Sequence, residues 1–295
     1  MLSNFECQTN GKWILCGEHA VIRNHPALVF PLKNMPLSLK FNTNNAPLSA
    51  SLTDHTKSRI DPILLSIVER GFSLLKINPE SYFGHFEFSS KLPIGSGLGA
   101  SAALSVAISK WFIAQNFIEE NDCYTFSREL ENLFHSKSSG LDIAGSMCDH
   151  GVYFQQGNIR SLNLSWAPKW FLSFSGTVGN TASCVKKVAK LLITSPKHSL
   201  ELDQQMAKSV NIAEQALTQI YTKNSILDLA KAINLASNCF TQWQLMNDDV
   251  NNHISKLQNA GAIATKPTGS GDGGYVLSLW QDKPPESLSD ILVEI

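Results

Sequence analysis

The sequence predicts an α+β fold, with strands and helices mixed rather than in regular alternation. Roughly the first fifty residues hold short apolar runs separated by turn residues, which is typical of strands. Residues 181–257 instead space their apolar residues as a helix does, with breaks near Ser195, Asn224 and Asn247. Because βα units do not repeat along the chain, we do not expect a Rossmann-type parallel sheet.

Apolar or alternating runs bounded by turn residues mark the expected strands. They cover residues 12–16, 20–22, 27–30, 37–41, 48–52, 85–91, 152–155, 159–164, 170–175 and 275–280, with 261–265 as a strand or a turn. The first expected helix runs over 61–76, because Asp61 suits the N-cap and Pro62 the first helical position. Further helices are expected from Ala100 to about 113, over 124–135 and shortly after residue 138.

The composition is that of a globular chain without marked charge. Of 295 residues, 43% are hydrophobic and 17% charged, and the formal net charge is −1, so we expect no basic face for nucleic acid or an anionic membrane. The six cysteines include no C-x-x-C pair, which argues against a zinc site or a disulfide framework and favours a cytoplasmic setting. The N-terminal residues lack a signal-peptide pattern, and no apolar run reaches the ~18–20 residues that span a bilayer. A small-molecule substrate is the expected partner, and the oligomeric state, a homodimer included, stays open.

A glycine-rich loop lies between an expected strand and an expected helix. Gly95, Gly97 and Gly99 fall within five residues, and Ala100 opens the helix. Glycine allows positive φ and close backbone approach, and a helix start offers unpaired N–H groups, so the loop suits a phosphate. Ser101, in the first helical turn, would reach a metal on that phosphate. The loop is neither a P-loop, which needs Lys-Ser/Thr after its last glycine, nor a G-x-G-x-x-G dinucleotide loop. A connection without a ligand is the alternative.

Glu131 and Asp142 are the candidate carboxylates for chemistry. Glu131 falls late on one expected helix and Asp142 early on the next, so the turn between them would point both at one place. Phosphoryl transfer needs a metal ligand and a group that accepts or positions the nucleophile's proton, and a carboxylate serves either purpose. The alternatives are a solvated Glu131 and a capping box over Ser139-x-x-Asp142.

Charged residues flank the first apolar strand. Lys12 begins it and would place an ammonium near a phosphate or a carboxylate, and Gly17-Glu18-His19 ends it in a turn with two ionisable groups. Without further context, a surface lysine and a polar turn explain both features.

A second glycine-rich loop, residues 266–274, precedes the last clear strand and contains four glycines. Such a loop implies tight turns and close approach of the backbone, or simply a hairpin. Asp272 within the loop either places a carboxylate near a metal or caps a turn. Thr181, at the start of the helical region, is most simply an N-cap.

In this order the motifs resemble those of the GHMP kinases. The end of the first loop, Gly97-Leu98-Gly99-x-Ser101-Ala102-Ala103, is similar to their nucleotide-binding signature. The stretch Gly11-Lys12-x-Ile14-Leu15-x-Gly17-Glu18-His19 most closely resembles the N-terminal motif of mevalonate kinases. Residues 131–142 align without a gap to the segment that holds their metal-ligand Glu and catalytic Asp, and the second glycine loop resembles the superfamily's C-terminal motif.

The resemblance implies the two-domain GHMP kinase fold. A ribosomal S5-like nucleotide-binding domain would cover residues 1–165, and a ferredoxin-like domain would cover residues 166–295. The resemblance also implies ATP and Mg²⁺ as cofactors and direct transfer of the γ-phosphoryl group to an alcohol. The first choice of reaction is (R)-mevalonate to 5-phosphomevalonate, a step of isoprenoid biosynthesis.

Roles for individual residues follow from the same resemblance. Asp142 would accept or orient the hydroxyl proton, and Lys12 would stabilise the transferred charge. Ser101 and Glu131 would hold Mg²⁺. The acceptor side would be lined by His19, Glu18 and Thr181. The phosphates would lie on Pro93, Gly95, Ser96, Gly97, Leu98, Gly99, Ala100, Ser101 and Ala102.

Departures from the family's pattern bear on the acceptor. Ser136 and Ser138 stand where a Gly and a Pro are usual, which concerns the shape of the turn. The continuation Asp142-Ile143-Ala144 is closer to phosphomevalonate kinases, so that activity, or another GHMP kinase, is the near alternative. A second acceptor phosphate would need extra cations, for which Lys137 and Lys186-Lys187 are candidates. A non-catalytic relative that binds a metabolite is the distant alternative, which the intact set of site residues disfavours.

Overall fold

The computed structural model describes residues 2–53, 58–60, 62–93, 95–134 and 138–295. The chain separates into two compact units. Unit 1 comprises Met1–Lys12, Pro31–Pro93 and Gly99–Asp149, and unit 2 comprises Trp13–Phe30, Ile94–Leu98 and His150–Ile295. The predicted division into domains 1–165 and 166–295 stays a prediction. Three residues named above, Asp61, Ser136 and Lys137, lie outside the described residues.

Two long strands, β1 and β2, each belong partly to one unit and partly to the other. The strands in and entering unit 1 are β1 (Phe5–Cys16), β2 (Ala27–Pro47), β3 (Ser49–Thr53), β4 (Ser58–Ile60) and β5 (Phe83–Ser90). β5 pairs antiparallel with β2 and parallel with β3, and β3 pairs antiparallel with β4. β2 merges two strands that were expected separately. Pro31 and Pro36 lie between its ladder with β6 of unit 2, at Ala27–Val29, and its ladder with β5, which begins at Leu37, so these two prolines cost neither ladder an N–H.

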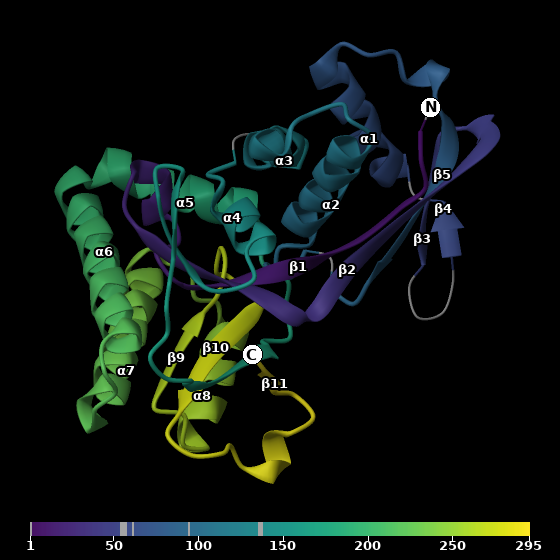
Figure 1. Ribbon diagram of the computed structural model, residues 1–295. Coiled ribbons are helices and arrows are strands. Elements are labelled where there is room, and N and C mark those ends of the chain that lie inside the picture. The colour runs from purple at the N-terminus through teal and green to yellow at the C-terminus, as the bar shows by residue number, and fades with distance from the viewer. Residues whose placement is uncertain (1, 54–57, 61, 94, 135–137) are drawn as a thin grey trace. The chain divides into compact units, whose positions relative to one another are not determined.

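Helix α2 forms the centre of the core of unit 1 and packs against α1, α3 and α4 (Figure 1). The helices of this unit are α1 (Pro62–Leu75), α2 (Ala100–Ala114), α3 (Cys123–Glu131) and α4 (Leu141–Met147), with the 3₁₀ turns η2 (Pro79–Ser81) and η3 (Glu120–Asp122). The start of α2 is rich in alanine, which admits its neighbours closely, and its end carries the fully buried Trp111 and Phe112. A Cβ on Gly71 of α1 would overlap the Phe112 ring, so glycine there permits close packing of α1 on α2.

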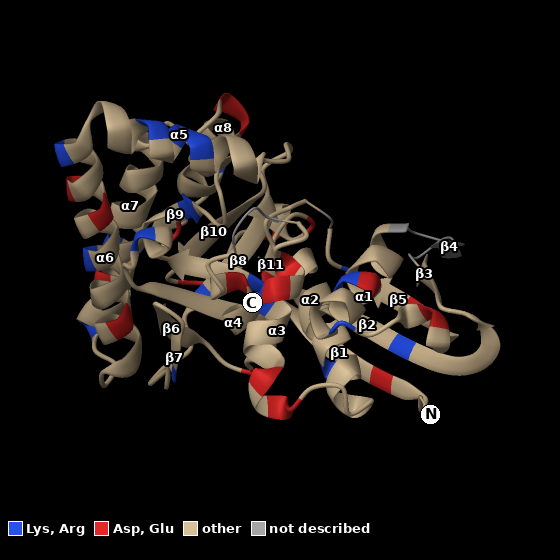
Figure 2. Ribbon diagram, turned by 90° about the horizontal axis from the view of Figure 1, so that it is seen from above, with Lys and Arg blue, Asp and Glu red and all other residues tan. Residues whose placement is uncertain are grey.

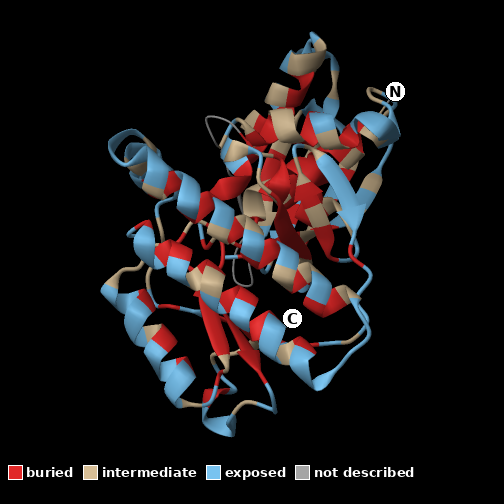
Figure 3. Cartoon of the chain, turned by 90° about the vertical axis from the view of Figure 1, so that its left-hand side faces the viewer, coloured by how far each residue is buried: buried red, intermediate tan, exposed pale blue. Residues whose placement is uncertain are grey.

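Unit 2 contains an antiparallel sheet in the order β11-β8-β10-β9 and, apart from it, the hairpin β6-β7. β6 also pairs with Ala27–Val29 at the start of β2. The strands are β6 (Val152–Gln155), β7 (Asn158–Ser161), β8 (Lys169–Phe174), β9 (Ala264–Pro267), β10 (Tyr275–Trp280) and β11 (Val293–Glu294). Every residue of β9 and β10 is buried, and both appear as red strands in Figure 3.

The helical region predicted over 181–257 is confirmed, with its breaks close to the predicted positions. The helices are α5 (Thr181–Thr194), α6 (Pro196–Thr218), α7 (Lys223–Gln242) and α8 (Asp248–Asn259), and the 3₁₀ turns of unit 2 are η1 (Ala20–Arg23) and η4 (Glu286–Leu288). Their buried residues recur at helical spacing, as Leu202, Met206 and Val210 do in α6, while the opposite faces are exposed (Figure 3). Within the described part of the chain, no helix is long and apolar enough to cross a membrane.

The strand expected over 20–22 is wrong, because these residues form the 3₁₀ turn η1. The backbone reverses here: Ala20 N donates to Glu18 O at 2.6 Å and Val21 N to Gly17 O at 3.1 Å. His19 and Asn24, on either side of η1, both have positive φ, at 60° and 70°. Local turn geometry therefore overrides the strand propensity of Val21 and its neighbour.

Candidate active site

Lys12 and Asp142 form an ion pair within unit 1. Lys12 lies on β1, and Asp142 is the second residue of α4. Lys12 Nζ is 3.0 Å from Asp142 Oδ2, and the side chains are 2% and 32% exposed. The ammonium is therefore held inside the unit, while the carboxylate it contacts remains accessible from one side. A surface position for Lys12, the alternative that the sequence left open, is wrong.

Gly140 sets the start of α4 and thereby the position of Asp142. It is the N-cap residue, with φ 83°, and a Cβ on it would overlap the hydroxyl of Tyr124. Both facts require glycine. The capping box over Ser139-x-x-Asp142 is therefore wrong: the Ser139 hydroxyl accepts a hydrogen bond from Leu141 N at 3.3 Å instead.

Gly99 ends the first glycine loop and caps α2 without a side-chain hydrogen bond. The first N–H groups of α2, from Ala100, Ser101 and Ala102, have no acceptor within the helix, as at any helix start. Gly99 has φ 80°, and a Cβ on it would lie 2.6 Å from Lys12 Cγ. The glycine therefore lets the lysine stem pass directly under the start of the helix.

We expect Gly99→Ala to destabilise the chain more than Gly157→Ala does. Both glycines have nearly the same backbone angle, with φ of 80° and 82°, but a Cβ on Gly157 meets nothing within 4 Å. Each variant should cost about 1–2 kcal/mol for the left-handed backbone, and only Gly99→Ala should cost a further ~1–3 kcal/mol for the clash with Lys12. Urea denaturation of both variants measures the difference. Equal losses would contradict the role given to the Lys12 contact.

Glu131 ends α3 and is buried, with 1% of its surface exposed. Its Oε2 accepts a hydrogen bond from the Ser138 hydroxyl, and its Oε1 has no hydrogen-bond partner among the described residues. Burial, followed by the nearby charge of Asp142, raises the pKa of Glu131 to about 8. The expected meeting of the two carboxylates is thus present, and a solvated Glu131 is wrong. A buried carboxylate with an unused oxygen suits a cation.

The first glycine loop is divided between the units. Pro93 and Gly99–Ala102 belong to unit 1, whereas Gly95, Ser96, Gly97 and Leu98 belong to unit 2. In unit 2 the loop lies against the second glycine loop: a Cβ on Gly269 would be 3.4 Å from Gly97 O, and one on Gly274 would be 2.9 Å from Ser96 O. The lack of a Cβ at Gly274, and less tightly at Gly269, therefore lets the second loop approach the backbone of the first.

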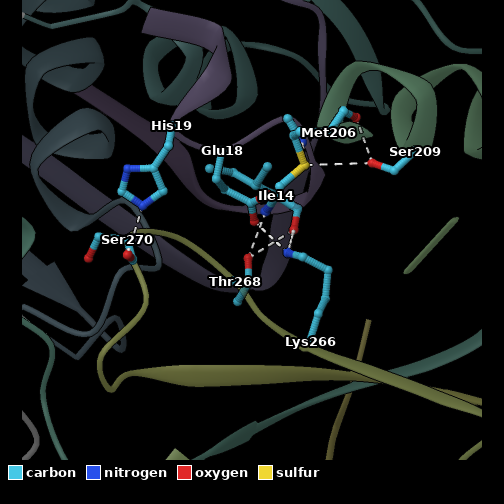
Figure 4. Close-up of polar contacts among 9 residues, drawn as sticks. Ile14, Glu18, His19, Met206, Ser209, Lys266, Thr268 and Ser270 are labelled. Carbon is cyan, nitrogen blue, oxygen red and sulfur yellow. Dashed lines mark hydrogen bonds and ion pairs between the residues drawn. The ribbon is translucent and has the colours of Figure 1, made fainter. Parts of the chain in front are cut away.

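The turn Gly17-Glu18-His19 lies in unit 2 and is held by the second glycine loop (Figure 4). His19 is buried, with φ 60°, and its Nε2 donates to Ser270 O at 2.9 Å. Burial lowers the pKa of His19 to about 4, so its ring is neutral near pH 7. Because a carbonyl oxygen only accepts, the ring proton is on Nε2, and Nδ1 carries a lone pair.

Glu18 and Lys266 form a second ion pair, deeper than the first. Glu18 Oε1 lies 2.5 Å from Lys266 Nζ, and the side chains are 2% and 0% exposed. Lys266 Nζ also donates to Ile14 O at 3.4 Å and stands 5.2 Å from the centroid of the Phe240 ring. The ammonium therefore bridges the end of β1 and the turn that follows it (Figure 4).

Alternate residues of the second loop all reach the same segment, Ile14–His19 (Figure 4). Lys266 contacts Glu18, and Ser270 contacts His19. Thr268 stands between them in the sequence, and its Oγ1 accepts from Ile14 N at 2.9 Å and donates to Ile14 O at 3.1 Å. Sequence reasoning missed these three residues as a group. The signal was partial: Lys266 and Thr268 are two positions apart where β9 ends, as residues on one side of a strand are, whereas Ser270 lies beyond the strand and makes its contact through its backbone carbonyl oxygen.

Thr181 and Asp272 make contacts other than those that the sequence most simply predicts. The N-cap of α5 is Asn180, whose side chain accepts from Ser183 N at 2.9 Å, so Thr181 is not the cap. Thr181 Oγ1 instead donates to Ser270 Oγ at 3.2 Å. The Asp272 carboxylate pairs with Lys187 Nζ at 2.8 Å, on a helix that carries lysines and no acidic residue (blue on α5 in Figure 2).

The structure thus places the predicted residues in two groups. Unit 1 brings Lys12, Glu131 and Asp142 together, with Ser101 half-buried in the first turn of α2. Unit 2 brings Glu18, His19 and Thr181 to the second glycine loop through Lys266 and Ser270.

Comparison with known proteins assigns the segment that holds Ser101, Glu131 and Asp142 of the first group. Residues 66–150 match the family described as "GHMP kinases N terminal domain", and they include the end of the glycine loop, Glu131 and Asp142. This chain carries a GHMP kinase N-terminal domain. The resemblance inferred from the motifs is therefore confirmed.

Several proteins similar to this chain are mevalonate kinases. The mevalonate kinase of Thermococcus sibiricus is 26% identical over 308 residues, covering 96% of this chain and 91% of that protein. The structure of L. major mevalonate kinase in complex with R-mevalonate matches with a TM-score of 0.78 at 19% identity, covering 96% of this chain and 90% of that one. Methanococcus jannaschii mevalonate kinase matches with a TM-score of 0.76 at 18% identity, covering 99% and 97%. The α+β GHMP kinase fold is confirmed.

Proposed function

We propose that this GHMP kinase transfers the γ-phosphoryl group of ATP to (R)-mevalonate, giving 5-phosphomevalonate. The observation that carries the proposal is the ion pair between the buried Lys12 and Asp142, with Glu131 nearby. All three residues belong to the motifs that the sequence analysis identified. The similarity to curated mevalonate kinases over 96% of the chain supports the choice of acceptor. A cytoplasmic location belongs to the same proposal.

Asp142 and Lys12 carry the chemistry. As the acceptor oxygen attacks phosphorus, its proton leaves, and the partly exposed Asp142 carboxylate accepts or orients that proton. Lys12 Nζ, 3.0 Å away, fixes the carboxylate by an ion pair and offsets negative charge on the transferred group. The first turn of α2 and its glycine loop offer backbone N–H groups to the phosphates of ATP.

Glu131 and Ser101 are the residues that would hold Mg²⁺. Glu131 Oε1 is a buried acceptor without a hydrogen-bond partner among the described residues, and Ser101 offers a hydroxyl at the start of α2. No group of three His, Cys, Asp or Glu side chains gathers for a metal in the described residues. This fits Mg²⁺, which commonly takes one or two carboxylates and completes its shell with water and phosphate oxygens. When bound, Mg²⁺ neutralises charge on the phosphates.

His19, Glu18 and Thr181 form the acceptor side. The His19 ring is neutral with its proton on Nε2, so Nδ1 accepts a hydrogen bond and suits a hydroxyl of the acceptor. The Glu18 carboxylate pairs with Lys266 and thereby supports the turn that carries His19. Thr181 joins the same loop through its hydrogen bond to Ser270.

Phosphomevalonate as the acceptor is the near alternative. A second phosphate would need a cation to pair with it. Of the candidates that the sequence offered, Lys187 already pairs with Asp272, and Lys137 lies outside the described residues. The pairing of Lys187 with Asp272 makes that lysine less available to a second phosphate and so favours the acceptor without one.

The test is an ADP-release assay with ATP, Mg²⁺ and a panel of acceptors: (R)-mevalonate, phosphomevalonate, galactose and homoserine. We expect the highest kcat/KM with (R)-mevalonate. A preference for phosphomevalonate would select the near alternative. Release of ADP with none of the four by folded protein would contradict the proposal.

A further inference from the structure

Ser138 lies between α3 and α4 in the chain and is buried, with 7% of its surface exposed. Its backbone N–H donates to Asn132 Oδ1 at 2.8 Å, which ties the residue to the end of α3. The side chain of Ser138 is therefore held at a fixed place next to Glu131.

The Ser138 hydroxyl makes hydrogen bonds in both directions. It donates to Glu131 Oε2 and accepts from Gly140 N at 3.0 Å. A serine hydroxyl has one proton and two lone pairs, so it can do both at once. One oxygen atom thereby connects the Glu131 carboxylate to the N-cap of the helix that carries Asp142.

The bond to Ser138 also determines which oxygen of Glu131 remains available. Oε2 is engaged by the hydroxyl, and Oε1 has no hydrogen-bond partner among the described residues. A carboxylate held at one oxygen cannot turn freely, so its second oxygen keeps one direction. Such supports of a metal ligand typically contribute 10–100-fold to metal affinity or activity.

The residue type matters, because Ser138 stands where the resembling kinases usually carry a proline. Proline has neither a hydroxyl nor a backbone N–H. None of the bonds from Ser138 to Asn132, Glu131 and Gly140 could form with it. The support of Glu131 described here therefore depends on the serine that this sequence carries.

We propose that Ser138 is a positioning residue that orients the Glu131 carboxylate toward a divalent cation and couples it to the helix carrying Asp142. This rests on the proposed function, in which Glu131 is a ligand of Mg²⁺. Ser138 itself touches neither the cation nor the substrates.

The test compares Ser138→Ala with Ser138→Thr, which keeps the hydroxyl, and with Ser146→Ala as the matched control. Ser146 is a buried serine of α4 whose hydroxyl has no hydrogen-bond partner among the described residues. Mn²⁺ binding is measured by electron paramagnetic resonance with ATP present and no acceptor alcohol. We expect Ser138→Ala to weaken Mn²⁺ binding about 10–100-fold, Ser138→Thr to restore most of it, and Ser146→Ala to leave it unchanged.

Steady-state kinetics supply a second readout. In Ser138→Ala the Mg²⁺ concentration for half-maximal rate should rise, while KM for the acceptor stays the same. In a Glu131→Gln background, Ser138→Ala should add nothing, because its effect acts through Glu131. This double-mutant cycle also distinguishes a loss of stability in Ser138→Ala from an effect on Glu131, because a merely structural effect would persist in the Glu131→Gln background.

The outcomes separate this inference from the proposed function. Wild-type turnover of mevalonate together with unchanged Mn²⁺ binding in Ser138→Ala would overturn the role of Ser138 alone. Failure of every acceptor, with Mn²⁺ binding still dependent on Ser138, would overturn the proposed reaction alone. Equal losses in Ser138→Ala and Ser146→Ala would show a structural effect and overturn the inference.

Discussion

Asp142→Asn should fold as the wild type does and lose about 10²–10⁴-fold in kcat. Asparagine has nearly the same shape, and its amide oxygen can still accept a hydrogen bond from Lys12 Nζ, now 3.0 Å from the carboxylate. It cannot take up the proton of the acceptor hydroxyl. The affinity for ATP should change little, because nothing in the proposal has Asp142 touching the nucleotide base or sugar.

Three measurements check this result: ADP release for kcat, calorimetric titration for ATP binding, and thermal melting for the fold. Asp282→Asn is the control, since Asp282 is an exposed aspartate of unit 2. Its kcat and melting temperature should equal those of the wild type. Unchanged turnover in Asp142→Asn would contradict the assignment. A low melting temperature together with lost ATP binding would point to a structural role instead.

Lys266→Met should produce the largest loss of stability, about 3–5 kcal/mol, because it removes one partner of a fully buried ion pair. The Glu18 carboxylate, 2% exposed, would lose the ammonium that now lies 2.5 Å from it. The variant also removes a hydrogen bond to Ile14 O and the contact of the ammonium with the Phe240 ring. Urea denaturation gives the value from the shift in midpoint at constant slope.

Lys187→Met is the matched control, because it makes the same substitution in the pair with Asp272. There the side chains are 42% and 28% exposed, and such partly solvated pairs contribute about 0–1 kcal/mol. The two variants therefore differ chiefly in burial. Similar losses in both would contradict the claim that the Glu18–Lys266 pair is the more important support.

The local parts of the fold and site could be predicted from the sequence. The glycine loop and the helix that follows it were marked by short-range patterns, whereas Lys12, Glu131 and Asp142 were selected by the resemblance. The loop and its helix could be predicted because their signals come from residues close together in the chain. Lys12 is far from Glu131 and Asp142 in the chain, and the three site residues were connected only by the resemblance, which spans all the motifs. The roles assigned to them stay predictions until the variants are made.

The long-range contacts could not be predicted. Lys266 and Ser270 contact Glu18 and His19 across about 250 positions, with sequence separations of 248 and 251. No periodicity connects residues so far apart. The turn η1 was missed for a related reason: its Ala-Val-Ile sequence favours a strand, and the surrounding positive φ angles decide otherwise. Capping was missed where a glycine, Gly140, took the place of the expected serine.

The contacts of His19 have a consequence for how the chain is made. His19 leaves the ribosome early, but Lys266, Thr268 and Ser270, which hold its segment, emerge some 250 residues later. At the usual pace of synthesis of about 5–20 residues per second, that delay is on the order of tens of seconds. Throughout this interval the nascent chain has the residues of the turn Gly17-Glu18-His19 but not those that fix its shape. Unit 2 can therefore complete its fold around His19 only late in biosynthesis. A chain released before residue 270 would lack the contacts that hold this turn.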